Sequence, residues 1–79
     1  MKWLYTSADG KILNRVNRDA WQHEFKITDD DGNTIARGVC DGLDNADGDE
    51  AFAPLDRLEG DGATTMYYRK MGDSTWHQL

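Results

Sequence analysis

The sequence predicts a small β-rich domain, all-β or α+β, in which about six short strands form an antiparallel meander or a partly open barrel. Three observations predict this class. The chain has 79 residues, which suits a single domain over residues 1–79 with one small core. It contains 12 Asp but only 3 Glu, and Asp favours turns whereas Glu favours helices. Gly, Asn and Asp recur between short apolar runs, at the spacing of antiparallel strands.

The first strand is expected over residues 2–6. Asp9-Gly10 is a strong signal for a two-residue hairpin, so residues 11–16 are expected to form the return strand. A helix over residues 11–21 remains the alternative, because three small or apolar side chains are four positions apart: Ile12, Val16 and Ala20.

The clearest strand covers residues 21–28. Two sets of residues alternate strictly along it. The apolar and aromatic set is Trp21, His23, Phe25 and Ile27, and the polar set is Gln22, Glu24, Lys26 and Thr28. This alternation predicts one buried face and one face in water. A turn at residues 29–33 leads to a strand over residues 34–40, where Ile35 and Val39 are expected on a common face.

A short helix is expected near residues 52–59. Pro54 suits a first helical turn, and Gly60 suits the position after a helix end. Residues 41–50 show neither a strand nor a helix pattern, so they are expected to form a loop. The chain is expected to continue as a hairpin of residues 64–70 and 75–79 around a turn at residues 71–74.

The net charge of −6 and the pI of about 4.6 argue against some classes of binding partner. A negative surface disfavours direct binding to nucleic acid or to an anionic membrane, because both require clusters of Lys and Arg. No apolar run approaches the roughly 20 residues of a membrane-spanning helix, and the first residues lack the pattern of a signal peptide. We therefore expect a cytoplasmic protein, in the host cytoplasm if a phage encodes it.

Neither a metal site nor a catalytic centre is expected. The acidic loops do not fit an EF-hand, because aligning Gly48 or Gly32 with its glycine leaves an apolar residue at the first ligand position. His23, Cys40 and His77 share no zinc-binding spacing. A thiolate at Cys40 is opposed by the neighbouring carboxylates. The sequence therefore predicts no cofactor, and a small metal-binding or enzymatic domain is only the third hypothesis.

The acidic residues are the candidate binding surface. We expect a non-enzymatic interaction module, carried by a phage or mobile element, that binds and inhibits a basic host protein. In its most specific form, the hypothesis is that the protein inhibits a nucleic-acid-handling complex of a bacterial defence system, a role similar to that of an anti-CRISPR protein. The alternative is a structural or assembly module, or a homo-oligomer, that uses its aromatic face at Tyr67, Tyr68 and Trp76. The candidate partner-binding residues are Asp29, Asp30, Asp31, Asp41, Asp44, Asp47, Asp49 and Glu50.

Overall fold

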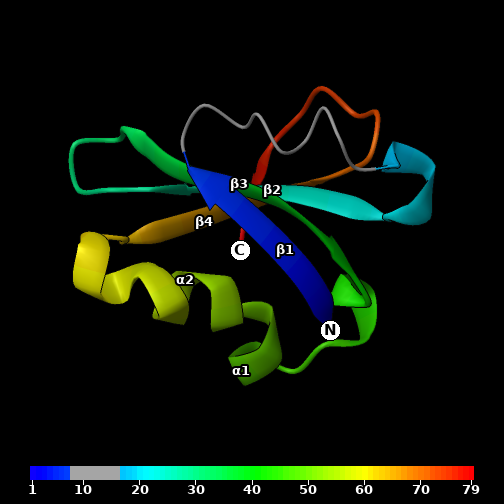
Figure 1. Ribbon diagram of the computed structural model, residues 1–79, viewed down its shortest axis with the longest axis horizontal. Coiled ribbons are helices and arrows are strands. Elements are labelled where there is room, and N and C mark those ends of the chain that lie inside the picture. Colours follow the sequence, from blue (N-terminus) through cyan, green and yellow to red (C-terminus); the bar gives the residue numbers. More distant parts are fainter. Residues whose placement is uncertain (8–16) are drawn as a thin grey trace.

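The computed structural model describes residues 1–7 and 17–79, and this part of the chain has the β-rich fold that the sequence predicts (Figure 1). Within these residues an open antiparallel sheet has the strand order β1-β3-β2-β4-β5. Helices α1 (Gly48–Ala51) and α2 (Ala53–Leu58) cover one face of the sheet. The strands are β1 (Lys2–Ser7), β2 (His23–Thr28), β3 (Thr34–Asp41), β4 (Thr65–Lys70) and β5 (His77–Gln78).

The sheet is built around the β2–β3 hairpin. Its turn is closed by Gly32, which has a φ of 80° that favours glycine, and by the hydrogen bond from the Asp29 N–H to the Asn33 carbonyl. Strand β1 pairs with the far side of β3, and β4 pairs with the far side of β2. The expected turn at Asp9-Gly10 and the expected strand at residues 11–16 lie outside the described residues.

The alternation predicted for residues 21–28 is right about the apolar face but wrong about its polar face. Phe25 and Ile27 are fully buried in the core. However, Glu24 and Thr28 are also buried, with exposed fractions of 3% and 6%. The reason is that β2 is a central strand, with neighbours on both sides. The strand also begins at His23, so Trp21 lies before it, under the ammonium group of Lys2.

A β-bulge changes the faces predicted for strand β3. The pairing with β2 shifts between Ile27 and Thr28, so that Thr34 rather than Ile35 lies opposite Thr28. Ile35 packs against the core beneath the helices, whereas Val39 is buried outside that core cluster. Ile35 and Val39 therefore do not share a face, and that prediction is wrong.

The core lies between the sheet and the helical layer, and Gly38 allows its tightest contact. A Cβ atom at this position would come closer than 3.0 Å to the Leu4 carbonyl oxygen and to the Phe25 ring, so the ring of Phe25 occupies the space above Gly38. The rest of the core cluster comes from both layers: Ile27, Ala36, Cys40, Leu43, Ala51, Leu58, Ala63 and Met66.

Helix α2 confirms the helix expected near residues 52–59, and it contains Pro54 near its start. Residues 41–50 are not wholly a loop, because they contain a 3₁₀ turn (Leu43–Asn45) and most of α1. Asp47 caps α1 by accepting a hydrogen bond from the Glu50 N–H, at 2.8 Å. Another 3₁₀ turn (Glu59–Asp61) extends α2 toward β4, and a further one (Arg18–Ala20) precedes β2.

The C-terminal hairpin is also present, although its second strand is shorter than expected. Strand β5 covers only His77–Gln78 and pairs with Tyr67 and Tyr68 of β4. The segment between β4 and β5 lies across the sheet on the side away from α1 and α2 (Figure 1). None of the helices in residues 1–7 and 17–79 has the length and apolar composition needed to cross a bilayer.

Candidate functional site

The acidic residues that the sequence indicates as a binding surface lie at both ends of β3. Residues 29–31 form the tip of the β2–β3 hairpin, and residues 41–50 start where β3 ends. Strand β3 has eight residues, and a strand rises about 3.3 Å per residue, so roughly 25 Å of sheet separates the two groups. The hairpin by itself therefore does not bring them together.

Several of these carboxylates stabilise the fold locally. Asp29 accepts hydrogen bonds from the backbone N–H groups of Asp31 and Asn33, at 3.0 and 2.9 Å, and so closes the hairpin turn. Asp47 caps helix α1. Replacing either residue would therefore destabilise the fold as well as change the surface charge.

Two further carboxylates of the set join distant segments, while others are free. Asp41 accepts a hydrogen bond from the Gln22 N–H at 2.7 Å, and Glu50 forms an ion pair with the Met1 amino group at 2.9 Å. Within the part of the chain that the structure describes, three of the predicted carboxylates make no hydrogen bond or ion pair: Asp30, Asp31 and Asp49.

The helical layer connects the two acidic groups through residues that the sequence analysis missed. Residues 41–62 contain eight carboxylates and one arginine, a net charge of −7, whereas the whole chain carries −6. Asp56, Glu59 and Asp61 are exposed members of this segment. Its last turn reaches the hairpin end of the sheet, because the Thr64 N–H donates a hydrogen bond to the Thr28 carbonyl at 2.9 Å. We call residues 41–62 the acidic layer.

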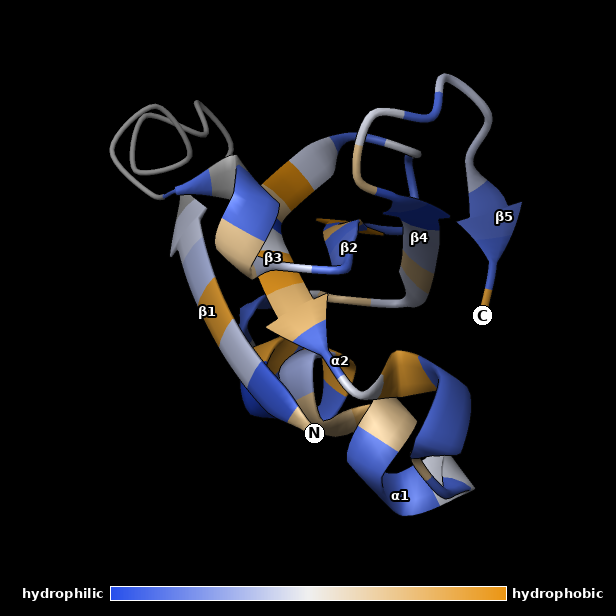
Figure 2. Ribbon diagram, turned by 90° about the vertical axis from the view of Figure 1, so that its right-hand side faces the viewer, coloured by the Kyte–Doolittle hydropathy of each residue, from blue (hydrophilic) through white to orange (hydrophobic). Residues whose placement is uncertain are grey.

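The acidic layer lies on one side of the molecule. In Figure 1 it runs beneath the sheet from the end of β3 to the start of β4, and Figure 2 shows the hydrophilic colour of α1 and its neighbouring turns. Lys26, Arg37 and Arg69 lie on the opposite face of the sheet, around the buried carboxylate of Glu24. A cluster of three cations and one carboxylate therefore lies across the sheet from the acidic layer. Summing charge over residues 41–62 could have found the acidic layer from sequence, whereas the cationic side depends on strand pairing.

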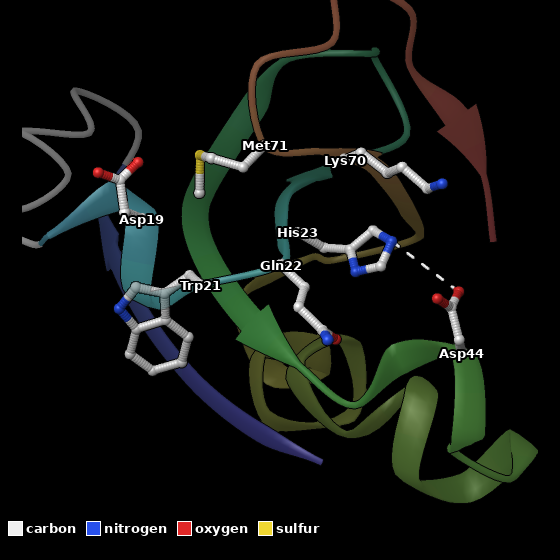
Figure 3. Close-up of a pocket in the computed structure, with 7 residues that line it drawn as sticks. All are labelled: Asp19, Trp21, Gln22, His23, Asp44, Lys70 and Met71. Atoms are coloured by element: carbon white, nitrogen blue, oxygen red, sulfur yellow. Dashed lines mark ion pairs between the residues drawn. The ribbon is translucent and has the colours of Figure 1, made fainter.

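A pocket of about 500 Å³ lies at the edge of the acidic layer, beside His23 (Figure 3). The His23 side chain is 3% exposed, and its Nε2 atom is 3.9 Å from Asp44 Oδ1. Its Nδ1 atom is buried without a hydrogen-bond partner among the described residues. The pocket is lined by Asp19, Trp21, Gln22, His23, Asp44, Lys70 and Met71.

A second cavity of about 380 Å³ shares His23, Asp44 and Lys70 with this pocket and extends to His77. The Tyr68 ring lies between the two imidazoles, with centroid distances of 6.1 Å to His23 and 5.7 Å to His77. Among the described residues, no three His, Cys, Asp or Glu side chains converge to hold a metal ion. The 3.9 Å separation of His23 and Asp44 is also too long for the hydrogen bond that would orient a general base.

Cys40 lies directly opposite His23 in the sheet, but its thiol is not activated. Burial and the negative charge of Asp41 raise the pKa of Cys40 from 9.0 to about 12. The thiol therefore stays protonated at neutral pH and packs as a small apolar side chain in the core.

The fold and these surfaces define a small antiparallel sheet domain with one helical layer and a strongly one-sided charge. Comparison with models of known protein families, with curated proteins and with solved structures finds no match to this chain.

Proposed function

We propose that this protein is a non-enzymatic interaction module that binds a basic protein surface through its acidic layer. The observation that carries the proposal is the net charge of −7 on residues 41–62, placed on one side of a molecule whose remaining residues sum to +1. Charge that only keeps a protein in solution can be spread over its whole surface, whereas charge that binds one partner has to be gathered on one side. The target class is a protein whose cationic groove binds nucleic acid, and the consequence of binding is inhibition, as in an anti-defence protein.

Exposed carboxylates on a rigid layer favour fast, salt-sensitive association. Asp49, Asp56, Glu59 and Asp61 are all exposed on elements packed against the sheet, so their positions are set before binding. Charge complementarity of this kind raises the association rate more than it strengthens the final complex. Asp44 lies at the edge of the layer and lines the pocket beside His23, where its exposed carboxylate is open to a basic side chain of the partner.

The test is affinity capture from bacterial lysate at roughly 50 and 500 mM salt, which span weak and strong screening. The variant Glu59→Gln/Asp61→Asn removes two exposed charges of the acidic layer. The matched control Asp19→Asn/Asp73→Asn removes two exposed charges outside it. Neither double variant includes a carboxylate that caps α1 or closes the hairpin turn.

The expected result is capture of a nucleic-acid-binding protein at low salt, several-fold lower yield with the acidic-layer variant, and unchanged yield with the control. Purified target should then lose nucleic-acid binding when this protein is added. Equal loss with both variants would contradict the proposal, because total charge rather than the acidic layer would then decide binding. Capture that survives high salt but is lost with Tyr68→Ala would instead indicate the assembly module.

A further inference from the structure

The sheet face away from the helices carries a small cationic pocket that the acidic layer does not explain. Its volume is about 270 Å³, and it is lined by Lys26 on β2, Thr34 and Arg37 on β3, and Trp76 just before β5. Two cations and one hydroxyl are therefore brought together, and the lining contains no carboxylate. All four side chains are partly exposed, so the pocket is open to solvent.

Cation–π contacts hold one wall of this pocket. The Lys26 ammonium lies 4.9 Å from the centroid of the Trp76 ring and 5.3 Å from that of Tyr67. The Arg69 guanidinium also lies over Trp76, at 4.2 Å. Contacts of this geometry are attractive, so Trp76 and Lys26 are held beside each other before any ligand arrives.

Glu24 positions Arg69 and Arg37 but leaves N–H donors of Arg37 available to a ligand. Its carboxylate is 3% exposed and forms an ion pair with Arg69. Arg37 Nη2 is 3.9 Å from the other carboxylate oxygen of Glu24, close enough for attraction but too far for a hydrogen bond. The Arg37 side chain is 34% exposed, so its N–H donors remain available at the pocket.

The β-bulge in β3 supplies the third polar group. Because the register shifts between Ile27 and Thr28, Thr34 lies opposite Thr28 and shares the pocket with Arg37, three positions further along the strand. Without the extra residue, Thr34 and Arg37 would point to opposite faces of the sheet. The bulge therefore places a hydroxyl donor beside the two cations.

We propose that this pocket binds the phosphate group of a small phosphate ester. Lys26, Arg37 and Arg69 with Glu24 give the cluster a net charge of +2, which matches a phosphate dianion, and the pocket supplies donors of three kinds to its oxygens. The volume lies just under the 300 Å³ at the low end for ligand pockets. It therefore fits a phosphate with a small substituent, whose carbon atoms would contact Trp76.

The same contacts argue against two other ligands. A carboxylate has one negative charge and two oxygens, so it would leave part of the donor set unused. A stacked nucleobase would compete with the cations of Lys26 and Arg69, which already lie over the Trp76 ring. Phosphate is therefore the part of the ligand that the pocket recognises.

The test is a titration of the isotope-labelled protein with inorganic phosphate, followed by NMR through the indole N–H signal of Trp76. Sodium chloride at the same ionic strength and sodium acetate are the reference anions, and glycerol 3-phosphate tests the small ester. The variants are Lys26→Gln, Arg37→Gln and the shape-conserving Thr34→Val. Arg57→Gln is the matched control, because Arg57 is an exposed cation on α2, in the other layer.

Saturable phosphate binding is expected in the wild type and in the Arg57 control, weakened about tenfold or more by Lys26→Gln or Arg37→Gln. Tighter binding of glycerol 3-phosphate than of inorganic phosphate would support the ester as the ligand, and equal binding would overturn that part of the proposal in favour of free phosphate. Shifts reproduced by chloride or acetate, or unchanged in Arg37→Gln, would overturn the proposal. If Lys26→Gln or Arg37→Gln fails to fold, Thr34→Val decides, since it keeps both cations and should still weaken binding several-fold.

Discussion

Replacing Gly38 with alanine tests the packing of the core most directly, because two opposite effects compete at this position. Alanine in a strand is normally more stable than glycine by about 0.5–1 kcal/mol, because glycine loses more conformational freedom on folding. At Gly38, however, the new Cβ would come closer than 3.0 Å to the Leu4 carbonyl oxygen and to the Phe25 ring. Overpacking of this kind typically costs about 1–3 kcal/mol.

The cost should lie toward the upper part of that range. The Phe25 ring can move only into a fully buried core, and the Leu4 oxygen belongs to the backbone of β1, which is paired to β3 along its length. We expect a net loss of about 1–2 kcal/mol in the free energy of unfolding. For a domain of this size, that loss lowers the Tm by roughly 4–16 °C.

The assay is thermal and urea unfolding of Gly38→Ala beside the control Gly48→Ala. Gly48 begins helix α1, and a Cβ there would have no atom within 4 Å, so the control should be as stable as the wild type or more stable. Adding Phe25→Leu to Gly38→Ala should recover only part of the loss, because the clash with the Leu4 oxygen remains. A Gly38→Ala protein as stable as the wild type would refute this account of the core.

Three further predictions follow from the described contacts. Asp47→Ala should lower the free energy of unfolding by about 1 kcal/mol through loss of the α1 cap, whereas Asp49→Ala should change it by less than about 0.5 kcal/mol in urea unfolding. Cys40 should react with a disulfide reagent at pH 9 far more slowly in the native protein than in denaturant, and fast labelling of the native protein would contradict this. The free energy of unfolding should also fall as pH rises from 9 toward 12, because in that range the thiol ionises only in the unfolded chain. Glu24→Gln should destabilise by about 1–3 kcal/mol in urea, because it leaves the partly buried Arg69 without its carboxylate.

The sequence predicted those strands and turns correctly whose pattern lies within a few consecutive residues. The alternation around Phe25 and Ile27 was enough to identify β2 and its buried face, and the Asp and Gly residues at 29–33 were enough to identify the turn. Helix α1 was missed although its signal is local. Asp47 followed three positions later by Glu50 is the pattern of a capping box, and it lies at the helix start.

Features that depend on distant pairing could not be predicted from these patterns. Glu24 was expected in water, and its burial follows from β4, whose Arg69 lies 45 positions later in the chain. The phosphate pocket likewise needs Trp76 to return over β2 and a bulge that turns Thr34 to the side of Arg37. The charge of Asp56, Glu59 and Asp61 could be summed from the sequence, but only the placement of the helices puts these residues on the same side of the sheet as residues 41–50.

The position of β1 beside β3 has a consequence for how the chain reaches its native state. Strands β2 and β3 are joined by a five-residue turn and can pair early, whereas the partners in β1 and β3 are 29 to 39 positions apart in sequence. Closing so long a loop costs conformational entropy, and β1 gains hydrogen bonds in return only after the hairpin has formed the β3 edge to which β1 pairs. We therefore expect β1 to dock late, so that its substitutions mainly accelerate unfolding and leave the folding rate nearly unchanged. During synthesis, β1 would leave the ribosome before β2 and β3 and yet join the sheet after them.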